Sequence, residues 1–166
     1  MSAIIKEYEL GEEGLKDAKH IEKLLSEIKF QTSGNRQPLT VSGKRPTSMP
    51  IGMKKMLDGT YGVPTFDKLY PHIYPVIRDF INKYAPDFNF NCGYVNKNVH
   101  MKPHKDKANT DSSLIIALGS YTGGNLIVEG ESLDIRYRLI EFDGKRQTHW
   151  TEEFEGDRYS IVIFEI

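Results

Sequence analysis

The sequence predicts an α+β protein in which a jelly-roll core of antiparallel strands carries N-terminal helices packed on its outside. Two segments before residue 87 repeat apolar residues at helical spacing, and the chain after Pro86 changes to short strand-like runs separated by turns. The chain has 166 residues, of which 39% are hydrophobic, and this is the size of one domain with its own core. We therefore expect a single domain over residues 1–166, with helices and a basic loop in 1–87 and the core strands in 88–166.

Two helices are expected in the N-terminal half. The first covers residues 14–30, where the apolar stripe consists of Leu15, Ala18, Ile21, Leu25 and Ile28. The second covers residues 66–84, where Leu69, Ile73, Ile77, Phe80, Ile81 and Tyr84 share one side. Pro71 and Pro75 fall in the first half of this segment, and proline removes a hydrogen bond inside a helix. We expect the second helix to be broken there or to begin later.

Residues 31–64 are rich in Gly, Pro, Ser and Thr, which predicts an extended loop with short pieces of structure. No Asp or Glu occurs from Ile28 to Leu57, where about four would be expected. Six cations lie in this stretch: Lys29, Arg36, Lys44, Arg45, Lys54 and Lys55. One interpretation is a solvated loop that happens to be basic. The other is a mobile arm placed against a phosphate backbone, in which Arg36, Lys44 and Arg45 bind the substrate.

Seven short strands are expected after Pro86. Their ranges are 88–95, 98–103, 113–118, 124–129, 133–142, 145–150 and 158–165, with turn signals at 121–124 and 143–144. Short strands that follow two helices favour a closed or double-sheet antiparallel architecture with the helices outside. A jelly roll is the natural candidate.

Several classes of protein are excluded or disfavoured by composition. The single cysteine, Cys92, excludes an internal disulfide framework and a cysteine-cluster metal site. The longest apolar runs, 114–118 and 161–164, fall far short of the roughly 20 residues of a membrane span. The first nine residues lack the basic and apolar regions of a secretory signal. We expect an intracellular protein, cytoplasmic or nuclear, with no membrane partner.

The spacing His-x-Asp/Glu, which suits a metal ion, occurs twice. His20 and Glu22 lie on the first predicted helix, where positions i and i+2 point about 200° apart and cannot hold one ion. His104 and Asp106 lie in an extended context, where positions i and i+2 share a face. The third ligand should come from a strand late in the sheet. His149, which lies 43 residues after Asp106 in a predicted strand, fits this requirement.

Two imidazoles and one carboxylate on one face leave three positions of an octahedral ion open. This is the facial triad of non-haem Fe(II) oxygenases. Zinc accepts the same ligands, so the triad alone does not choose the metal. His100 comes shortly before the triad and is a candidate to line the mouth of the site and contact the substrate.

Arg158 and Ser160 favour iron, because they suggest a site for a dicarboxylic cosubstrate. They share one face of the last strand and would point where His149 points if the two strands pair. Arginine holds a carboxylate through two parallel hydrogen bonds, and a hydroxyl adds a third. The alternative is an arginine paired with a neighbouring acid, Asp157 or Glu155. Beside a triad, the clamp on a cosubstrate is the favoured interpretation.

These residues resemble a known family. The triad with Arg158-Tyr-Ser160 resembles the 2-oxoglutarate/Fe(II) dioxygenase superfamily. Three longer strings, at 96–109, 113–126 and 149–164, resemble its TET/JBP branch, the nucleic-acid base hydroxylases. Within them the patterns HxDxxN, LGxYxGGxL and FxGDRYS carry the likeness, which covers roughly 90–166, about half of the chain.

The resemblance implies a double-stranded β-helix core, Fe(II), 2-oxoglutarate and dioxygen, with DNA as the partner. Members of the branch hydroxylate the 5-methyl carbon of 5-methylcytosine or thymine. At the matching positions, His104, Asp106 and His149 would hold the iron as the catalytic centre. Arg158 would bind the distal carboxylate of 2-oxoglutarate with assistance from Ser160.

The resemblance also implies contacts around this centre. Tyr94 and Asn96 are candidate partners for the other end of the cosubstrate. Asn109 would bond either the cosubstrate or the base edge, or else cap its own loop. The sequence lacks the cysteine-rich extension and long insert of animal TET proteins and the separate DNA-binding domain of J-binding proteins. We therefore expect the grip on nucleic acid to come from residues 29–55 and from the loops around the site.

Four lysines flank the triad, and they either contact phosphates beside an extruded base or form a solvated strand rim. They are Lys97, Lys102, Lys105 and Lys107.

The alternatives for the function also stay open. In one alternative, the chain is a 2-oxoglutarate oxygenase that acts on an N-methylated base, a nucleotide, RNA or a protein side chain. In the other, it is a non-catalytic cupin-like domain that binds nucleic acid. Ascorbate replaces 2-oxoglutarate as the reacting cosubstrate in one class of TET-like enzymes. The sequence does not indicate an oligomeric state.

Overall fold

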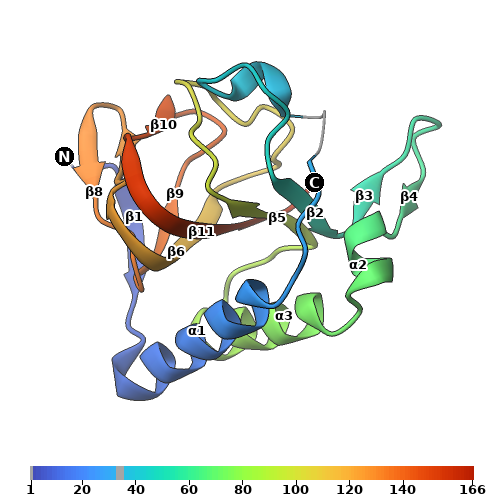
Figure 1. Ribbon diagram of the computed structural model, residues 1–166, viewed down its shortest axis with the longest axis horizontal. Coiled ribbons are helices and arrows are strands. Elements are labelled where there is room, and N and C mark those ends of the chain that lie inside the picture. The colour runs from blue at the N-terminus through green and yellow to red at the C-terminus, as the bar shows by residue number, and fades with distance from the viewer. Residues whose placement is uncertain (1, 33–35) are drawn as a thin grey trace.

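The computed structural model describes residues 2–32 and 36–166. The expectations for Met1 and for positions 33–35 of the basic loop therefore lie outside the described residues. The strands of the described chain form a six-stranded antiparallel sheet, a three-stranded sheet and a separate hairpin (Figure 1). The six-stranded sheet has the order β1 (Ile4–Tyr8), β9 (Leu139–Phe142), β6 (Ser113–Gly123), β11 (Phe154–Phe164), β5 (Cys92–Lys97), β2 (Ser48–Gly52). The three-stranded sheet has the order β10 (His149–Thr151), β7 (Leu126–Val128), β8 (Glu131–Leu133). The hairpin pairs β3 (Lys54–Lys55) with β4 (Tyr61–Gly62).

The two larger sheets enclose an apolar interior, and alternation along the strands decides which side chains enter it. In β6, Ile115 and Ala117 belong to the interior cluster with residues of β7 and β8, whereas Leu114 and Ile116 belong to the cluster under the helices. A strand with both faces buried reads as a continuous apolar run, as 114–118 does. This arrangement is the double-stranded β-helix that the sequence predicts.

Helices cover the outer face of the six-stranded sheet (Figure 1). They are α1 (Gly11–Ser26), α2 (Thr65–Leu69) and α3 (Ile73–Tyr84), and a short 3-10 turn, η1 (Gln37–Leu39), lies in the basic loop. The stripe of α1 packs through Ala18, Ile21 and Leu25 into the same buried cluster as Ile77 of α3. Each fully buried Leu or Ile contributes about 1.5–3 kcal/mol. The second expected helix is broken between α2 and α3, around Pro71, as its prolines predict.

Both edges of the six-stranded sheet come from the N-terminal half of the chain. β1 pairs with β9, and β2 pairs with β5. The expected division, with core strands only in 88–166, is therefore wrong for these two strands. β2 contains Pro50, which an edge strand tolerates because one side of it has no partner.

The bounds of the expected strands shift by several residues, and three of these strands are lost, divided or much shortened. Residues 98–103 form only an isolated bridge between Met101 and Thr40, because Asn98 has a φ of 53° and Pro103 has no amide hydrogen. The expected strand 133–142 is two strands, β8 and β9, separated by a turn in which Tyr137 has a φ of 56°. The expected strand 145–150 is reduced to β10 at its end. In the part of the chain that the structure describes, no helix combines the length and apolar character needed to cross a bilayer.

Candidate metal and cosubstrate site

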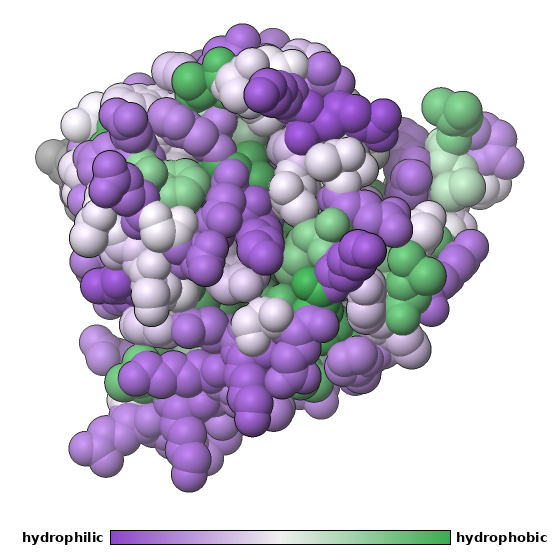
Figure 2. Space-filling view, in the orientation of Figure 1, coloured by the Kyte–Doolittle hydropathy of each residue, from purple (hydrophilic) through white to green (hydrophobic). Residues whose placement is uncertain are grey.

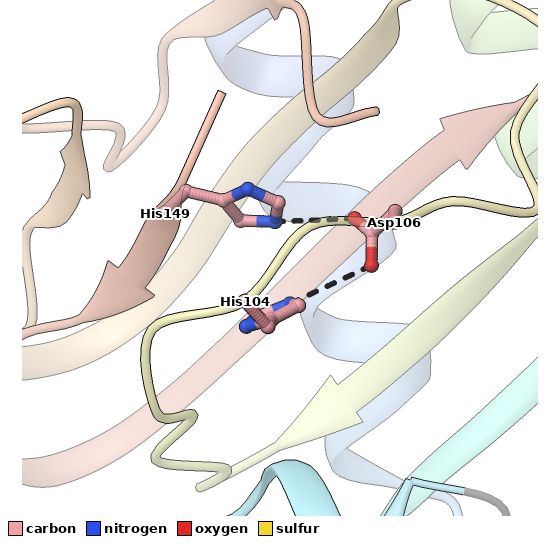
Figure 3. A group of neighbouring side chains, drawn as sticks. All are labelled: His104, Asp106 and His149. Carbon is pink, nitrogen blue, oxygen red and sulfur yellow. Dashed lines mark hydrogen bonds and ion pairs between the residues drawn. The ribbon is translucent and has the colours of Figure 1, made fainter. Parts of the chain in front are cut away.

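The structure brings His104, Asp106 and His149 together (Figure 3). One potential ligand atom from each residue lies within 4.8 Å of those of the other two. His149 begins β10, whereas His104 and Asp106 lie in the segment that follows β5. Figure 3 shows both imidazoles directed at the carboxylate of Asp106.

Backbone hydrogen bonds hold the three residues in place. The amide of His104 donates to the carbonyl of His149 and the amide of His149 donates to the carbonyl of His104, each at 3.0 Å. The amide of Asp106 donates to the carbonyl of Gly144 at 2.8 Å. A Cβ at position 144 would lie 3.3 Å from Oδ2 of Asp106, so a glycine here leaves room for the carboxylate. The segment from His104 to Asp106 thus runs beside β10 as an extended chain. In an extended chain two residues at positions i and i+2 point to the same side, as a shared metal ion requires.

The hydrogen bonds of the two imidazoles leave their Nε2 atoms in need of a cation. Nδ1 of His104 lies 2.6 Å from the carbonyl oxygen of Lys102, and Nδ1 of His149 lies 3.0 Å from that of Gln147. A carbonyl oxygen only accepts, so each Nδ1 must carry the hydrogen. In the neutral imidazoles both Nε2 atoms then present lone pairs to Asp106, at 3.5 Å from His104 and 3.1 Å from His149. Nε2 of His104 is also buried without a hydrogen-bond partner. A positive charge is needed between these groups, and a divalent metal ion supplies it.

The carboxyl of Asp106 is suited to remain ionised. Burial alone would raise its pKa, but the two imidazoles and the guanidinium of Arg36 outweigh burial and hold the pKa well below its ordinary value. Arg36 reaches to within 3.7 Å of Oδ1 of Asp106. The site therefore offers an anionic oxygen ligand across the whole physiological range.

Arg158 is buried, with 3% of its surface exposed, on the interior face of β11. Its Nε donates to the carbonyl of Gly124 at 3.0 Å, and its guanidinium lies 5.6 Å from the ring of Tyr121 and 5.7 Å from the ring of Phe154. A Cβ on Gly124 would meet the arginine at 3.0 Å, and the φ of this glycine is +72°. Here the turn in the LGxYxGGxL string makes space for the arginine side chain.

No carboxylate among residues 2–32 and 36–166 lies within 4 Å of the Arg158 guanidinium. The neighbouring acids Asp157 and Glu155 are exposed, whereas Arg158 is buried. Burial lowers the pKa of Arg158, and the phenol oxygen of Tyr121 partly opposes that shift. A buried cation that lacks a protein counter-charge is a built-in site for an anion.

The sequence left open whether the strands of Arg158 and His149 pair. β11 lies between β5 and β6, and β10 pairs with β7, so the strands of Arg158 and His149 do not pair. Both residues nevertheless line one narrow cavity, of about 40 Å³, between the two facing sheets. The lining also includes Asn96, Ser160 and apolar residues: Val99, Met101, Ile115, Leu126, Phe142 and Val162.

Asn96 and Ser160 form one hydrogen-bonded unit in this cavity. They are opposite each other in the β5–β11 register, and the amide nitrogen of Asn96 donates to Oγ of Ser160 at 3.0 Å. The hydroxyl of Ser48, on β2, donates to the amide oxygen of Asn96 at 2.6 Å. Ser48 was not identified from the sequence, because its contribution depends on the pairing of β2 with β5. These three side chains hold one another in place. Oγ of Ser160 accepts a hydrogen bond from Asn96, so its own hydrogen is free to donate into the cavity.

Arg36 lies in the site itself instead of on an exposed arm. It is 9% exposed, and its guanidinium stacks over the ring of Tyr94 at 4.6 Å while facing Asp106. Both Arg36 and Tyr94 line a cleft of about 550 Å³ that also reaches Asp106 and Asn109. The amide nitrogen of Asn109 donates to Oγ of Ser113 at 2.9 Å, so this side chain also holds its own loop.

The cleft beside the metal site is basic. Four lysines line it: Lys54, Lys55, Lys105 and Lys107. Lys44 and Arg45 are exposed but do not line this cleft or the interior cavity. His100 lines neither of them, and its ring lies 6.4 Å from that of Phe154. The structure therefore brings Arg36 to the site and leaves these three sequence-predicted substrate contacts outside it.

No protein-family model and no curated protein matches the chain. Solved structures of 2-oxoglutarate oxygenases do share its fold. NgTET1 in complex with 5mC DNA has a TM-score of 0.65 and 13% identity over 94% of this chain and 69% of that one. An oxidoreductase of the 2OG-Fe(II) oxygenase family from Burkholderia pseudomallei has a TM-score of 0.57 and 15% identity over 88% and 76%. A prolyl hydroxylase in complex with a hypoxia inducible factor peptide fragment from Trichoplax adhaerens has a TM-score of 0.55 and 13% identity over 93% and 79%. At these identities the likeness is one of fold.

Proposed function

We propose that the chain is an Fe(II)/2-oxoglutarate-dependent dioxygenase that hydroxylates the 5-methyl group of a pyrimidine base, 5-methylcytosine or thymine, in DNA. The observation that carries this proposal is that one cavity needs a cation at one end and an anion at the other. Three side chains at one end require a cation, and the buried guanidinium of Arg158 at the other end requires an anion. A metal ion bound by a dicarboxylate satisfies both.

In this proposal His104, Asp106 and His149 hold the iron, and the donor set of two imidazoles and a carboxylate suits it. Iron(II) with bound 2-oxoglutarate supplies the chemistry that inserts one oxygen atom of O2 into a C–H bond while the cosubstrate becomes succinate and CO2. The protein residues determine which C–H bond is placed beside the metal and which side reactions are excluded.

Arg158 and Ser160 bind the distal carboxylate of the cosubstrate, the first through paired N–H donors and the second through its hydroxyl. Asn96 orients that hydroxyl. The apolar walls, which include Ile115 and Val162, keep water from the reacting end of the cavity. A clamp of this kind favours 2-oxoglutarate over ascorbate, which is a lactone and carries no carboxylate for Arg158 to bind.

The basic cleft supports DNA as the substrate. It adjoins Asp106, and it is large enough for a base, because ligand pockets of about 300–1,000 Å³ bury molecules of that size. Its lysines match a phosphate backbone. The 5-methyl group of a paired base projects into the major groove, but the metal residues lie inside the protein, so the target base must leave the stack to reach them. Arg36 lines both the cleft and the cavity of the metal residues and stacks over Tyr94, so these two side chains would lie between an extruded base and the metal site.

The experiment that tests this function supplies Fe(II), 2-oxoglutarate and ascorbate with methylated DNA, RNA or peptide, and analyses the products by mass spectrometry. We expect a hydroxymethyl pyrimidine in the DNA sample and succinate formation linked to it. The variant Asp106→Ala should form neither, while its circular dichroism spectrum stays that of the wild type. Hydroxylation only of RNA or peptide would overturn the DNA assignment, and an active Asp106→Ala would overturn the metal site.

A further inference from the structure

The β3–β4 hairpin and its flanks, residues 53–63, project from the body of the molecule beside β2 (Figure 1). We call these residues the hairpin arm. β3 and β4 pair over only two residues each, at Lys54 with Gly62 and at Lys55 with Tyr61. Figure 2 shows apolar side chains on the end of this projection, away from the helices.

The hairpin arm exposes far more apolar surface than its own fold requires. Leu57 is fully exposed, at 111%, in the turn. Met56 is 45% exposed, Tyr61 52% and Val63 56%. Single exposed apolar residues are ordinary, but a contiguous group on a projecting element marks an interaction site. The arm therefore presents an apolar tip to a partner.

The same arm is cationic. Lys54 and Lys55 lie at its base and line the cleft beside the metal site. Its acid, Asp58, accepts hydrogen bonds from the amide and hydroxyl of Thr60 at 2.9 Å and 2.6 Å and stays ionised, so the two lysines leave the arm a net charge of +1. The partner is therefore anionic on its outside, where the lysines lie, and apolar where the tip reaches. A nucleic-acid duplex combines a phosphate exterior with a stack of bases inside.

The arm is long enough to reach past the mouth of the cleft. Leu57 is two residues beyond Lys55, which lines the cleft, and a strand rises about 3.3 Å per residue, so the turn lies at most about 7 Å beyond the cleft lining. Tyr61 and Met53 continue the arm's apolar surface down to the cleft, which they also line. The tip and the cleft are thus parts of one surface, and one bound molecule can contact both.

We propose that the hairpin arm inserts Leu57, supported by Met56, into the base stack of a DNA duplex at the place that the target base vacates. This inference rests on the proposed function and adds to it the preference for duplex substrate. An extruded base leaves a gap whose unstacking costs a few kcal/mol, and an apolar wedge that fills the gap recovers part of that cost. The lysines at the base of the arm hold the backbone while the flipped base occupies the cleft.

The test compares Leu57→Ser with a matched variant, Leu15→Ser, which changes a leucine that is 37% exposed on α1. Both variants and the wild type are bound, without turnover, to a duplex that carries 2-aminopurine next to the target base. We expect a rise in 2-aminopurine fluorescence for the wild type and for Leu15→Ser, because the stack opens. We expect little or none for Leu57→Ser.

Turnover is then measured on the same strand in duplex and single-stranded form. Leu57→Ser should lower the rate on the duplex about 10-fold and leave the rate on the single strand unchanged, because only the duplex requires a wedge. Equal fluorescence and equal rates for Leu57→Ser and the wild type would overturn the inference. A loss of rate on single strands to the same extent would also overturn it. The fluorescence needs no chemistry, so an inactive wild type that still opens the stack would refute the proposed function and leave the arm's role standing.

Discussion

Nε2 of His149 lies 3.1 Å from Oδ2 of Asp106, while Nδ1 of the same imidazole lies 3.0 Å from the carbonyl oxygen of Gln147. The second contact assigns the ring hydrogen to Nδ1, so the first brings two lone pairs together in the neutral site. The arrangement is stable only with a positive charge between the two atoms.

Metal binding should stabilise the folded protein. At a concentration of Co(II) or Mn(II) about 100 times its Kd, the gain is about 2.7 kcal/mol, which for a domain of this size corresponds to a rise in Tm of about 5–10 °C. Asp106→Asn should remove this rise, because it replaces the anionic ligand. Asp111→Asn, an exposed position in the same loop, should keep it. Differential scanning calorimetry under nitrogen makes the comparison, and an equal rise in both variants would exclude Asp106 as a ligand.

Arg158→Met should raise the KM for 2-oxoglutarate about 10- to 100-fold, because charged hydrogen bonds of about 1.5–3 kcal/mol are lost. Methionine fits the apolar space between Tyr121 and Phe154, so the fold should remain. Arg136→Met is the control, since Arg136 also lies against Tyr121 but is exposed. Titration of 2-oxoglutarate in an assay of succinate formation gives the KM of each variant. An unchanged KM in Arg158→Met would show that the cosubstrate binds elsewhere.

The cleft lysines should contribute to DNA binding through counterion release. Replacing both Lys105 and Lys107 with Ala should reduce the slope of log K against log salt by about 2, because each phosphate contact contributes about 0.9. The matched control replaces Lys16 and Lys23, exposed lysines of α1. Fluorescence anisotropy at several salt concentrations measures the slope. A change of the same size in the control pair would mean that the cleft has no special part in binding.

The free energy of unfolding should fall at high pH because of two tyrosines. Burial raises the pKa of Tyr8 to about 12, with help from Glu141, and burial raises that of Tyr137 to about 12, with help from Glu22. A group whose pKa is higher in the folded state loses its contribution as pH rises from the unfolded value, about 10, toward the folded one. Guanidinium unfolding at pH 9 and at pH 11.5 measures the loss. The double variant Tyr8→Phe, Tyr137→Phe should lose less stability over that interval, and an equal loss would place its origin elsewhere.

The His104–Asp106 pair and Arg158 could be proposed from the sequence because each depends on local spacing, whereas His149 is proposed because it is a histidine in a predicted strand late in the sheet. His104 and Asp106 are two residues apart on an extended segment, as are Arg158 and Ser160 on β11, so alternation alone puts each pair on one face. The double-stranded β-helix could be predicted for a related reason. Its strands are short apolar runs between glycine turns, and the helices carry clear stripes.

The features that could not be predicted depend on pairing between distant segments. β2 belongs to the sheet only because it pairs with β5, and that pairing also brings Ser48 to Asn96. Arg36 is buried because the chain folds it onto Tyr94 and Asp106, which lie far along the sequence. In the sequence it looks like any other cation of a basic loop. β10 pairs with β7 instead of β11 because β10 and β11 belong to two different sheets that face each other. No local sequence pattern indicates to which sheet a strand belongs.

The most direct test of the central claim is a labelling experiment under ¹⁸O2 with Fe(II), 2-oxoglutarate and a duplex that carries 5-methylcytosine or thymine. The account predicts one ¹⁸O atom in the new hydroxymethyl group, one in succinate, and equal amounts of the two products. Succinate formed without any hydroxylated base, or a hydroxylated base formed without succinate, would contradict it.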